Sequence, residues 1–183
     1  MAFSRDIMSV ILFLLVKLAK TKVKKMALEI ERKFLVDCSR WKPSNAGTRM
    51  VQVYLSVFPS PTVRVRIAGE KAFLTIKGRS ETIARPEFEY EIPLNDANEL
   101  MKLAVSRPIE KTRYETNFDG LIWEIDIFSG ENEGLVMAEV ELKTVDQKIK
   151  LPEWILEEVS ADGRFYNSYL SGHPFRDWKP DLT

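Results

Sequence analysis

Between Ala27 and Val36 the sequence alternates in a way that predicts a β-strand with two unlike faces. Glu29, Glu31 and Lys33 fall on one face, because successive side chains of a strand point to opposite sides of the sheet. The other face carries Leu28, Ile30, Arg32 and Phe34. Two carboxylates placed in this way are about 7 Å apart, and like charges are unfavourable neighbours in a sheet. The pair suits a divalent cation, since hard cations take carboxylate oxygens as ligands.

The same alternation recurs in later segments, and each segment carries charges of almost one sign. The basic segments contribute Arg64 and Arg66 (62–67), Lys77 (73–77), and Lys111 and Arg113 (111–114). The acidic segments contribute Glu87, Glu89 and Glu91 (87–91), Glu124 and Asp126 (123–127), and Glu139 and Glu141 (138–142). The intervening residues are β-branched, aliphatic or aromatic, which is typical of a pleated apolar surface.

A single strand of this kind is most simply explained by one buried face and one solvated, charged face. A solvated sheet, however, normally mixes signs across strands, because each opposite-charge pair contributes roughly 0.2–1 kcal/mol. Segregation by strand is explained if the acidic strands converge on metal ions and the basic strands on an anion. The predicted architecture is a closed antiparallel barrel with a charged interior and an apolar outside, covered in part by helices.

Turn and capping residues predict the remaining organisation. Asp119-Gly120 is typical of a two-residue turn between two strands. Asn95 is expected to cap a helix over 96–105, and a second helix is expected from Ser160 or Asp162 to Leu170.

In their order, these motifs resemble those of the CYTH, or triphosphate tunnel metalloenzyme, superfamily over about residues 27–175. The family's E-x-E-x-K signature stands here as Glu29-Ile-Glu-Arg-Lys33. The other motifs follow as Arg64 and Arg66, Lys77, Glu87 and Glu89, Glu110 to Tyr114, Glu124 and Asp126, Glu139 and Glu141, and Glu158 to Asn167. The resemblance implies an α+β, mainly β fold: a closed eight-stranded antiparallel β-barrel, the triphosphate tunnel, with a few covering helices. In it, basic residues clamp a triphosphate and acidic residues hold Mg²⁺ or Mn²⁺.

The resemblance and the residue types together assign expected roles. The metal ligands are Glu29, Glu31, Glu124, Asp126, Glu139 and Glu141. The substrate-binding residues are Arg64, Arg66, Lys77, Arg113, Arg85 and Arg164. The catalytic residues are Glu29, Glu31, Lys33, Lys111 and Tyr54, and Glu87 and Glu89 orient the basic clamp or ligate the metal. Guanidinium groups suit the clamp because they match phosphate oxygens in bidentate geometry and stay ionised.

Three of these residues have a simpler alternative role. Arg85 contacts the mouth of the tunnel or is a loop cation. Arg164 contacts phosphate or forms a surface ion pair. Tyr54 assists proton transfer or is a packed structural tyrosine.

Composition bounds the class of protein. The 183 residues suit one domain, expected over 26–183, and 27 basic residues balance 27 acidic ones, so no net field recruits nucleic acid or a membrane. Cys38 is the only cysteine, which excludes an intrachain disulfide and suits the cytoplasm. His173 is the only histidine, which argues against serine–histidine triads and histidine-ligated zinc.

The first 25 residues do not fit the strand pattern. The run from Ile7 to Val16 is apolar except for Ser9, and five lysines follow it by residue 25. It is too short for a membrane span, which needs about 20 apolar residues. The segment is an extension foreign to the domain, a membrane-surface anchor, or a helix that faces a partner or the lumen.

The predicted function is metal-dependent hydrolysis of inorganic tripolyphosphate to pyrophosphate and phosphate by a monomer or homodimer. The compact chain favours this small substrate, because no insert for an adenine or thiamine group is evident. The alternatives are a thiamine triphosphatase, a nucleotide enzyme (an NTPase or an adenylate cyclase of the CYTH type), and a non-catalytic polyphosphate-binding module.

Overall fold

The computed structural model describes residues 27–57, 61–78 and 84–178, except for the side chains of 27–29 and 84–86. The predicted extension over 1–25 lies outside the described residues. The strands are β1 (Ala27–Val36), β2 (Thr48–Ser56), β3 (Thr62–Ala68), β4 (Lys71–Lys77), β5 (Ala84–Ile92), β6 (Ile109–Phe118), β7 (Leu121–Ser129), β8 (Val136–Glu141) and β9 (Ile155–Glu158). The helices are α2 (Leu94–Met101) and α3 (Asn167–Leu170), with 3-10 turns η1 (Gly130–Asn132), η2 (Gly163–Phe165) and η3 (Phe175–Asp177).

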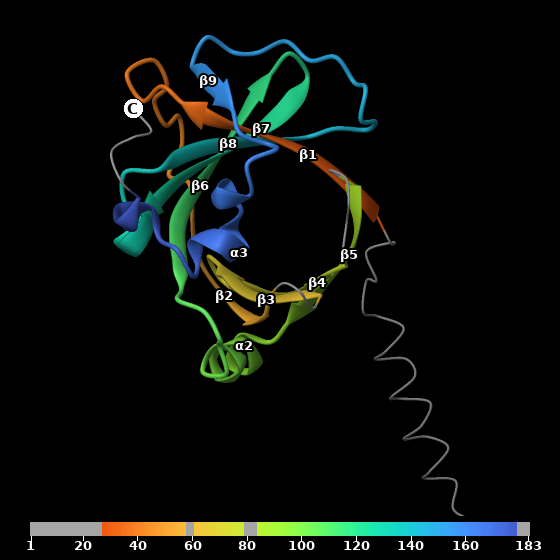
Figure 1. Cartoon of the computed structure of the whole chain (residues 1–183), viewed down its shortest axis with the longest axis vertical. Coiled ribbons are helices and arrows are strands. Elements are labelled where there is room, and N and C mark those ends of the chain that lie inside the picture. Colours follow the sequence, from red (N-terminus) through yellow and green to blue (C-terminus); the bar gives the residue numbers. More distant parts are fainter. Residues whose placement is uncertain (1–26, 58–60, 79–83, 179–183) are drawn as a thin grey trace, which may run out of the picture.

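The nine strands form one antiparallel sheet in the order β5-β4-β3-β2-β6-β7-β8-β1-β9. The sheet curls strongly, so that β5 comes back beside β1 (Figure 1). The curl gives the sheet a concave inner face and a convex outer face. The charged residues of the alternating segments lie on the inner face, where most of them line one pocket.

The expectation of a closed eight-stranded barrel is wrong, because the strands form a single nine-stranded sheet that ends on β9. β5 pairs with only four residues of β1, from Ala27 to Ile30. The last part of β1 pairs instead with β9, through Phe34 and Val36. The sequence Ile-Leu-Glu-Glu of β9 does not alternate, and it forms a strand because the edge of β1 is available to it.

An ion pair on the outer side of this contact predicts a pH-dependent contribution to stability. Arg32 Nε donates to Glu158 Oε1 at 2.8 Å, and this hydrogen bond lowers the pKa of Glu158. The stabilisation is therefore present above the unfolded pKa of about 4.3 and is lost as the pH falls through the lower folded pKa. We expect Glu158→Gln to be less stable than the wild type at pH 7, by less than about 1 kcal/mol because the pair is partly exposed. Urea unfolding at pH 7 and below about pH 3 measures the difference, and a difference that persisted unchanged in acid would contradict it.

The apolar face of the alternation packs on the outside of the sheet. Ile30 and Phe34 of β1 join Trp123 and Ile125 of β7 in a buried cluster with Trp41. The indole of Trp154 packs edge-on against Trp123, with 5.6 Å between ring centroids. On the opposite side of the molecule, α2 covers β2, β3 and β4.

Both helical predictions differ in detail from the structure. The first helix starts at Leu94, after Pro93 at the N-cap, and ends at Met101 rather than at residue 105. The second breaks into η2 and α3, because Tyr166 between them has an extended backbone. None of the described helices is long and apolar enough to cross a membrane.

At one end the inner face changes from charged to apolar. Ile109, Phe128 and Met137 stand on the inner faces of β6, β7 and β8, and they form a buried cluster with Phe165 and Leu170. The C-terminal segment thus packs inside the curl, where Figure 1 shows α3. This apolar cluster bounds the charged region at that end.

Candidate functional site

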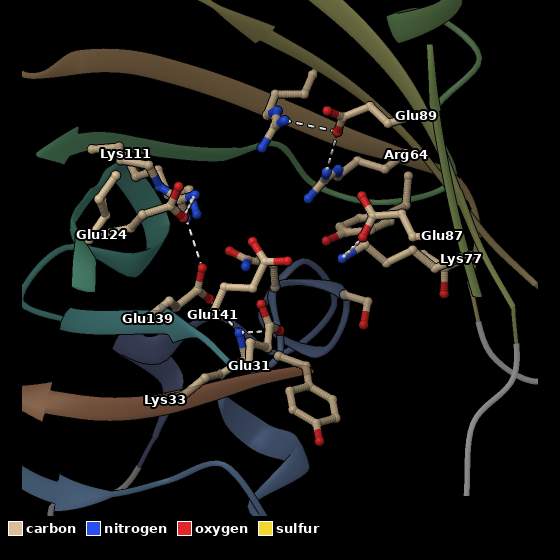
Figure 2. Close-up of a pocket in the computed structure, with 18 of the residues that line it drawn as sticks. Glu31, Lys33, Arg64, Lys77, Glu87, Glu89, Lys111, Glu124, Glu139 and Glu141 are labelled. Atoms are coloured by element: carbon tan, nitrogen blue, oxygen red, sulfur yellow. Dashed lines mark hydrogen bonds and ion pairs between the residues drawn. The ribbon is translucent and has the colours of Figure 1, made fainter. Parts of the chain in front are cut away.

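A pocket of about 320 Å³ occupies the charged part of the inner face. Figure 2 shows its acidic and basic side chains pointing toward one another from opposite walls of the curled sheet. The lining residues that the sequence predicted are Glu31, Lys33, Tyr54, Arg64, Arg66, Lys77, Glu87, Glu89, Lys111, Arg113, Glu124, Glu139 and Glu141. The structure therefore brings together residues from eight strands, β1 to β8, spread over more than a hundred positions of the chain.

Acidic and basic strands are neighbours in the sheet, so the segregated charges of the sequence become ion pairs. β6, with Lys111 and Arg113, lies beside β7, with Glu124 and Asp126. In the same way, Lys77 of β4 stands opposite Glu87 of β5, with Nζ 3.0 Å from Oε2. Charges that are mostly of one sign along a strand therefore alternate in sign across parts of the pocket wall.

The inner faces of β6, β7, β8 and β1 form one side of the pocket, here called the acidic wall, and Arg113 lies at its centre. Its Nε donates to Asp126 Oδ1 at 2.7 Å, and its Nη2 donates to Asp126 Oδ2 at 2.6 Å and to Glu139 Oε2 at 2.8 Å. Its Nη1 also pairs with Glu124. Burial opposes the charge on Arg113, but the three carboxylates outweigh it and raise the pKa further. The guanidinium thus stays charged and fixes three acidic side chains.

Within this wall, Lys33 links β1 to β8. Its Nζ lies 2.7 Å from Glu31 Oε1 and also pairs with Glu139. Burial alone would lower the pKa of Lys33, but Glu139 and Glu31 outweigh it and raise the pKa. Burial likewise opposes the charge on Glu139, whose pKa Lys33 and Arg113 hold well below its usual range. Both groups are therefore ionised at neutral pH.

Lys111 differs from Lys33 because it sits next to the apolar end of the pocket. Its side chain is 2% exposed, and its Nζ pairs with Asp126. The same Nζ lies 5.4 Å from the centre of the Phe128 ring. Burial is the main cause that lowers the pKa of Lys111 to about 8, and nearby Arg113 adds to it against the attraction of Asp126. Lys111 is thus a lysine that can exchange a proton close to neutral pH.

The opposite wall, formed by β3, β4 and β5, carries two arginines that share one acid. Arg66 Nη2 donates to Glu89 Oε2 at 3.0 Å, and Arg64 Nη2 donates to Thr75 Oγ1 at 3.1 Å and approaches the same Glu89 oxygen at 3.4 Å. The Nε atoms of both arginines are buried and have no hydrogen-bond partner among the described residues. Burial, followed by repulsion from Arg64, lowers the pKa of Arg66 to about 10. The two arginines therefore carry more positive charge than the one acid that they share can neutralise.

Like charges stand directly opposite each other on three neighbouring strands of the acidic wall. Glu31 of β1 is opposite Glu141 of β8, and Glu139 of β8 is opposite Glu124 of β7. In Figure 2, Glu31 and Glu141 point into the same part of the pocket. Burial raises the pKa of Glu124, and Glu139 adds to this against the attraction of Arg113. Such directly opposed acids are destabilising unless a cation separates them.

Some predicted residues lie outside the pocket or outside the described side chains. Asp126 is fully buried on the inner face of β7 and does not line the pocket; it accepts hydrogen bonds from Lys111 and Arg113. Arg164 does not line the pocket, and its Nε donates to both carboxylate oxygens of Asp162 at 2.9–3.0 Å. Glu29 and Arg85 stand opposite each other on β1 and β5, but their side chains are not among those described.

Sequence reasoning missed part of the lining. The unpredicted residues are Thr62, Glu115, Ile122, Tyr166, Asn167 and Ser168. Glu115 and Ile122 share the period-two parity of their strands with Arg113 and Glu124, so the alternation could have found them. The last three residues come from the C-terminal segment, whose return into the curl no local pattern indicates.

Comparison with known proteins identifies relatives of this chain and the family to which it belongs. An inorganic triphosphatase of Acetivibrio thermocellus is 44% identical over 155 residues, which are 84% of this chain and 99% of the relative. An inorganic triphosphatase of Nitrosomonas europaea is 34% identical over 148 residues, 78% of this chain and 96% of the relative. A crystal structure of an inorganic triphosphatase is 34% identical and has a TM-score of 0.59, covering 80% of this chain and 95% of that one. The CYTH domain model matches residues 27–169. Because this match spans most of the chain, the protein belongs to the CYTH domain family.

Proposed function

We propose that the protein hydrolyses inorganic tripolyphosphate to pyrophosphate and phosphate in this pocket, with a divalent metal ion, Mg²⁺ or Mn²⁺. The observation that carries the proposal is that one pocket combines two arginines sharing a single acid with carboxylates in directly opposed like-charge pairs. Excess positive charge on one wall suits a polyanion, and opposed carboxylates on the other suit a cation. The two relatives named as inorganic triphosphatases make this small substrate the best candidate.

The donor set fits a hard cation by its chemistry. Glu31, Glu124, Glu139 and Glu141 all line the pocket and offer carboxylate oxygens. Glu141 has no ion pair with any described residue. No three acidic side chains of the described part are yet gathered around one point, because Lys33 and Arg113 draw several of them into ion pairs. A bound ion would supply Lewis-acid polarisation of a phosphoryl oxygen and a more acidic water.

The protein's own residues are proposed to bind and orient the substrate. Arg64 and Arg66 line the pocket and would take phosphate oxygens with guanidinium N–H groups other than those bonded to Thr75 and Glu89. Lys77 adds charge on the same wall and Arg113 on the opposite one. Phosphoryl transfer needs mainly positioning and charge stabilisation, which fixed cations in a partly enclosed pocket provide. Lys111 Nζ can hold or release a proton near neutral pH, which suits a role in moving the proton of the attacking water.

The test is phosphate release by the purified protein with Mg²⁺ or Mn²⁺ and three substrates side by side: tripolyphosphate, ATP and thiamine triphosphate. We expect a strong preference for tripolyphosphate and complete loss of activity with EDTA. Preference for ATP or thiamine triphosphate would replace the proposed substrate, and cyclic AMP as a product would identify a cyclase. Tight binding of polyphosphate without turnover would refute the enzymatic function. A cytoplasmic location and a monomeric or homodimeric state remain predictions.

A further inference from the structure

Gln52 is a fully buried amide that none of the expected site roles uses. It stands on the inner face of β2, opposite Arg66 on β3 and Ile109 on β6. Its side chain is 0% exposed, and its Oε1 has no hydrogen-bond partner among the described residues. A buried carbonyl without a partner is unfavourable, and methionine would fill a similar volume without that penalty. The packing of the sheet alone therefore gives no reason for an amide here.

The contact that the amide does make is with a residue of the pocket. Gln52 Nε2 donates to the Tyr54 hydroxyl at 3.1 Å. Tyr54 is 4% exposed and lines the pocket, and its backbone N–H donates to Ser106 Oγ at 2.9 Å. The tyrosine is thus held at its backbone by Ser106 and at its phenol by Gln52.

The direction of this hydrogen bond determines what the phenol can offer. Because the phenol oxygen accepts a hydrogen bond from the Gln52 amide, the phenol's own hydrogen must be directed to a different acceptor. Tyr54 stands opposite Arg64 on β3, on the wall proposed to bind phosphate. A hydroxyl at this place has phosphate oxygens as its natural acceptors when the anion is bound.

We propose that Gln52 is a positioning residue for the reaction: its amide holds the Tyr54 hydroxyl so that the phenol O–H points to a phosphate oxygen of the bound triphosphate. This inference rests on the proposed function and adds to it a residue that does not itself touch the substrate. In this proposal Tyr54 donates a hydrogen bond to phosphate. The reaction, and not the stability of the fold, then explains why an amide is buried at position 52.

The test compares kcat and KM for tripolyphosphate hydrolysis in the wild type, Gln52→Met, Tyr54→Phe and the double variant. We expect Gln52→Met to lower kcat about tenfold with KM changed less than about twofold, because the contact orients a group without binding the substrate. We expect no further loss from Gln52→Met when Tyr54 is already phenylalanine. Gln147→Met, which changes a glutamine that bonds Lys143 outside the pocket, is the matched control. Wild-type kcat in Gln52→Met, or the same loss in both backgrounds, would overturn the proposal.

A second measurement does not depend on turnover. With ¹³C at the ζ carbon of all five tyrosines, the signal missing in Tyr54→Phe identifies Tyr54. We expect Gln52→Met to shift this signal and to leave the other four unchanged, because only Tyr54 loses a hydrogen bond to its hydroxyl. If Gln52→Met left the Tyr54 signal unmoved while the wild type hydrolysed tripolyphosphate, the role of Gln52 would be refuted and the proposed function would stand. A wild type that releases no phosphate from tripolyphosphate instead refutes the proposed function, and with it the role of Gln52 in turnover.

Discussion

Replacing Arg113 with methionine is expected to lower the free energy of unfolding by about 3–5 kcal/mol, the usual range for removing one partner of a buried ion pair. Arg113 bonds Asp126 twice and also contacts Glu139 and Glu124, and its side chain is 10% exposed. Without it, Lys111 alone faces the fully buried Asp126, and the opposed pair Glu124 and Glu139 loses the cation between them. Urea unfolding followed by circular dichroism measures the change.

Two controls separate the buried network from charge in general. Arg113→Lys keeps one positive charge but loses the planar fork that spans three carboxylates, so its loss of stability should be smaller than that of Arg113→Met. Arg49→Met removes an exposed arginine whose side chain pairs with Glu110, and it should change stability by less than about 0.5 kcal/mol. If Arg113→Met were as stable as Arg49→Met, the network would not hold the acidic wall together.

Replacing Glu139 with glutamine is expected to lower kcat for tripolyphosphate by about 100-fold or more, equivalent to about 2.7 kcal/mol. Glu139 pairs with Lys33 through one oxygen and accepts from Arg113 through the other at 2.8 Å. An amide has only one acceptor oxygen, so its NH₂ group would face a cation, and the wall would lose one negative charge of the proposed metal site. Phosphate release at saturating substrate and metal measures the effect.

The matched control for this substitution is Glu110→Gln, which changes a glutamate that bonds Arg49 outside the pocket and should leave kcat unchanged. Circular dichroism establishes whether each variant is folded. If Glu139→Gln were folded and kept wild-type turnover, Glu139 would have no part in the reaction. If the wild type and Glu139→Gln bound tripolyphosphate equally well and neither hydrolysed it, the pocket would be a binding site only.

The sequence predicted the strands well where the alternation was strict. The first predicted strand, 27–36, agrees with β1, and the Asp119-Gly120 turn is confirmed, since both residues have positive φ and Phe118 pairs with Leu121. These features are local: side-chain period and turn chemistry are encoded within a few residues. Thirteen of the predicted site residues lie around one pocket. They do so because the charged side chains of each strand alternate with apolar ones and therefore face the inside of the curl together.

What the sequence did not predict depends on contacts between distant segments. β9 has no alternation and forms only because the end of β1 offers it an edge. The sequence left two roles open for Glu89, to orient the basic clamp or to ligate the metal, and its pairing with Arg64 and Arg66 follows from strand order, which the charge pattern of single strands does not contain. The return of residues 165–170 into the curl depends on the apolar inner-face residues of β6, β7 and β8. Gln52 has the parity of the site but not its charge, so a search for charged residues passes over it.

The pairing of β1 also has a consequence for folding on the ribosome. β1 emerges first among the described strands, yet all three of its neighbours, β5, β8 and β9, are synthesised later, the last of them ending at Glu158. Pairing over such long sequence separations is slow, because loop-closure entropy is lost before the contacts form. Until then the ten-residue segment that becomes β1 has no strand to pair with on either side. We expect its four charged residues, Glu29, Glu31, Arg32 and Lys33, to disfavour pairing of this segment with another chain, because they interrupt an otherwise apolar run.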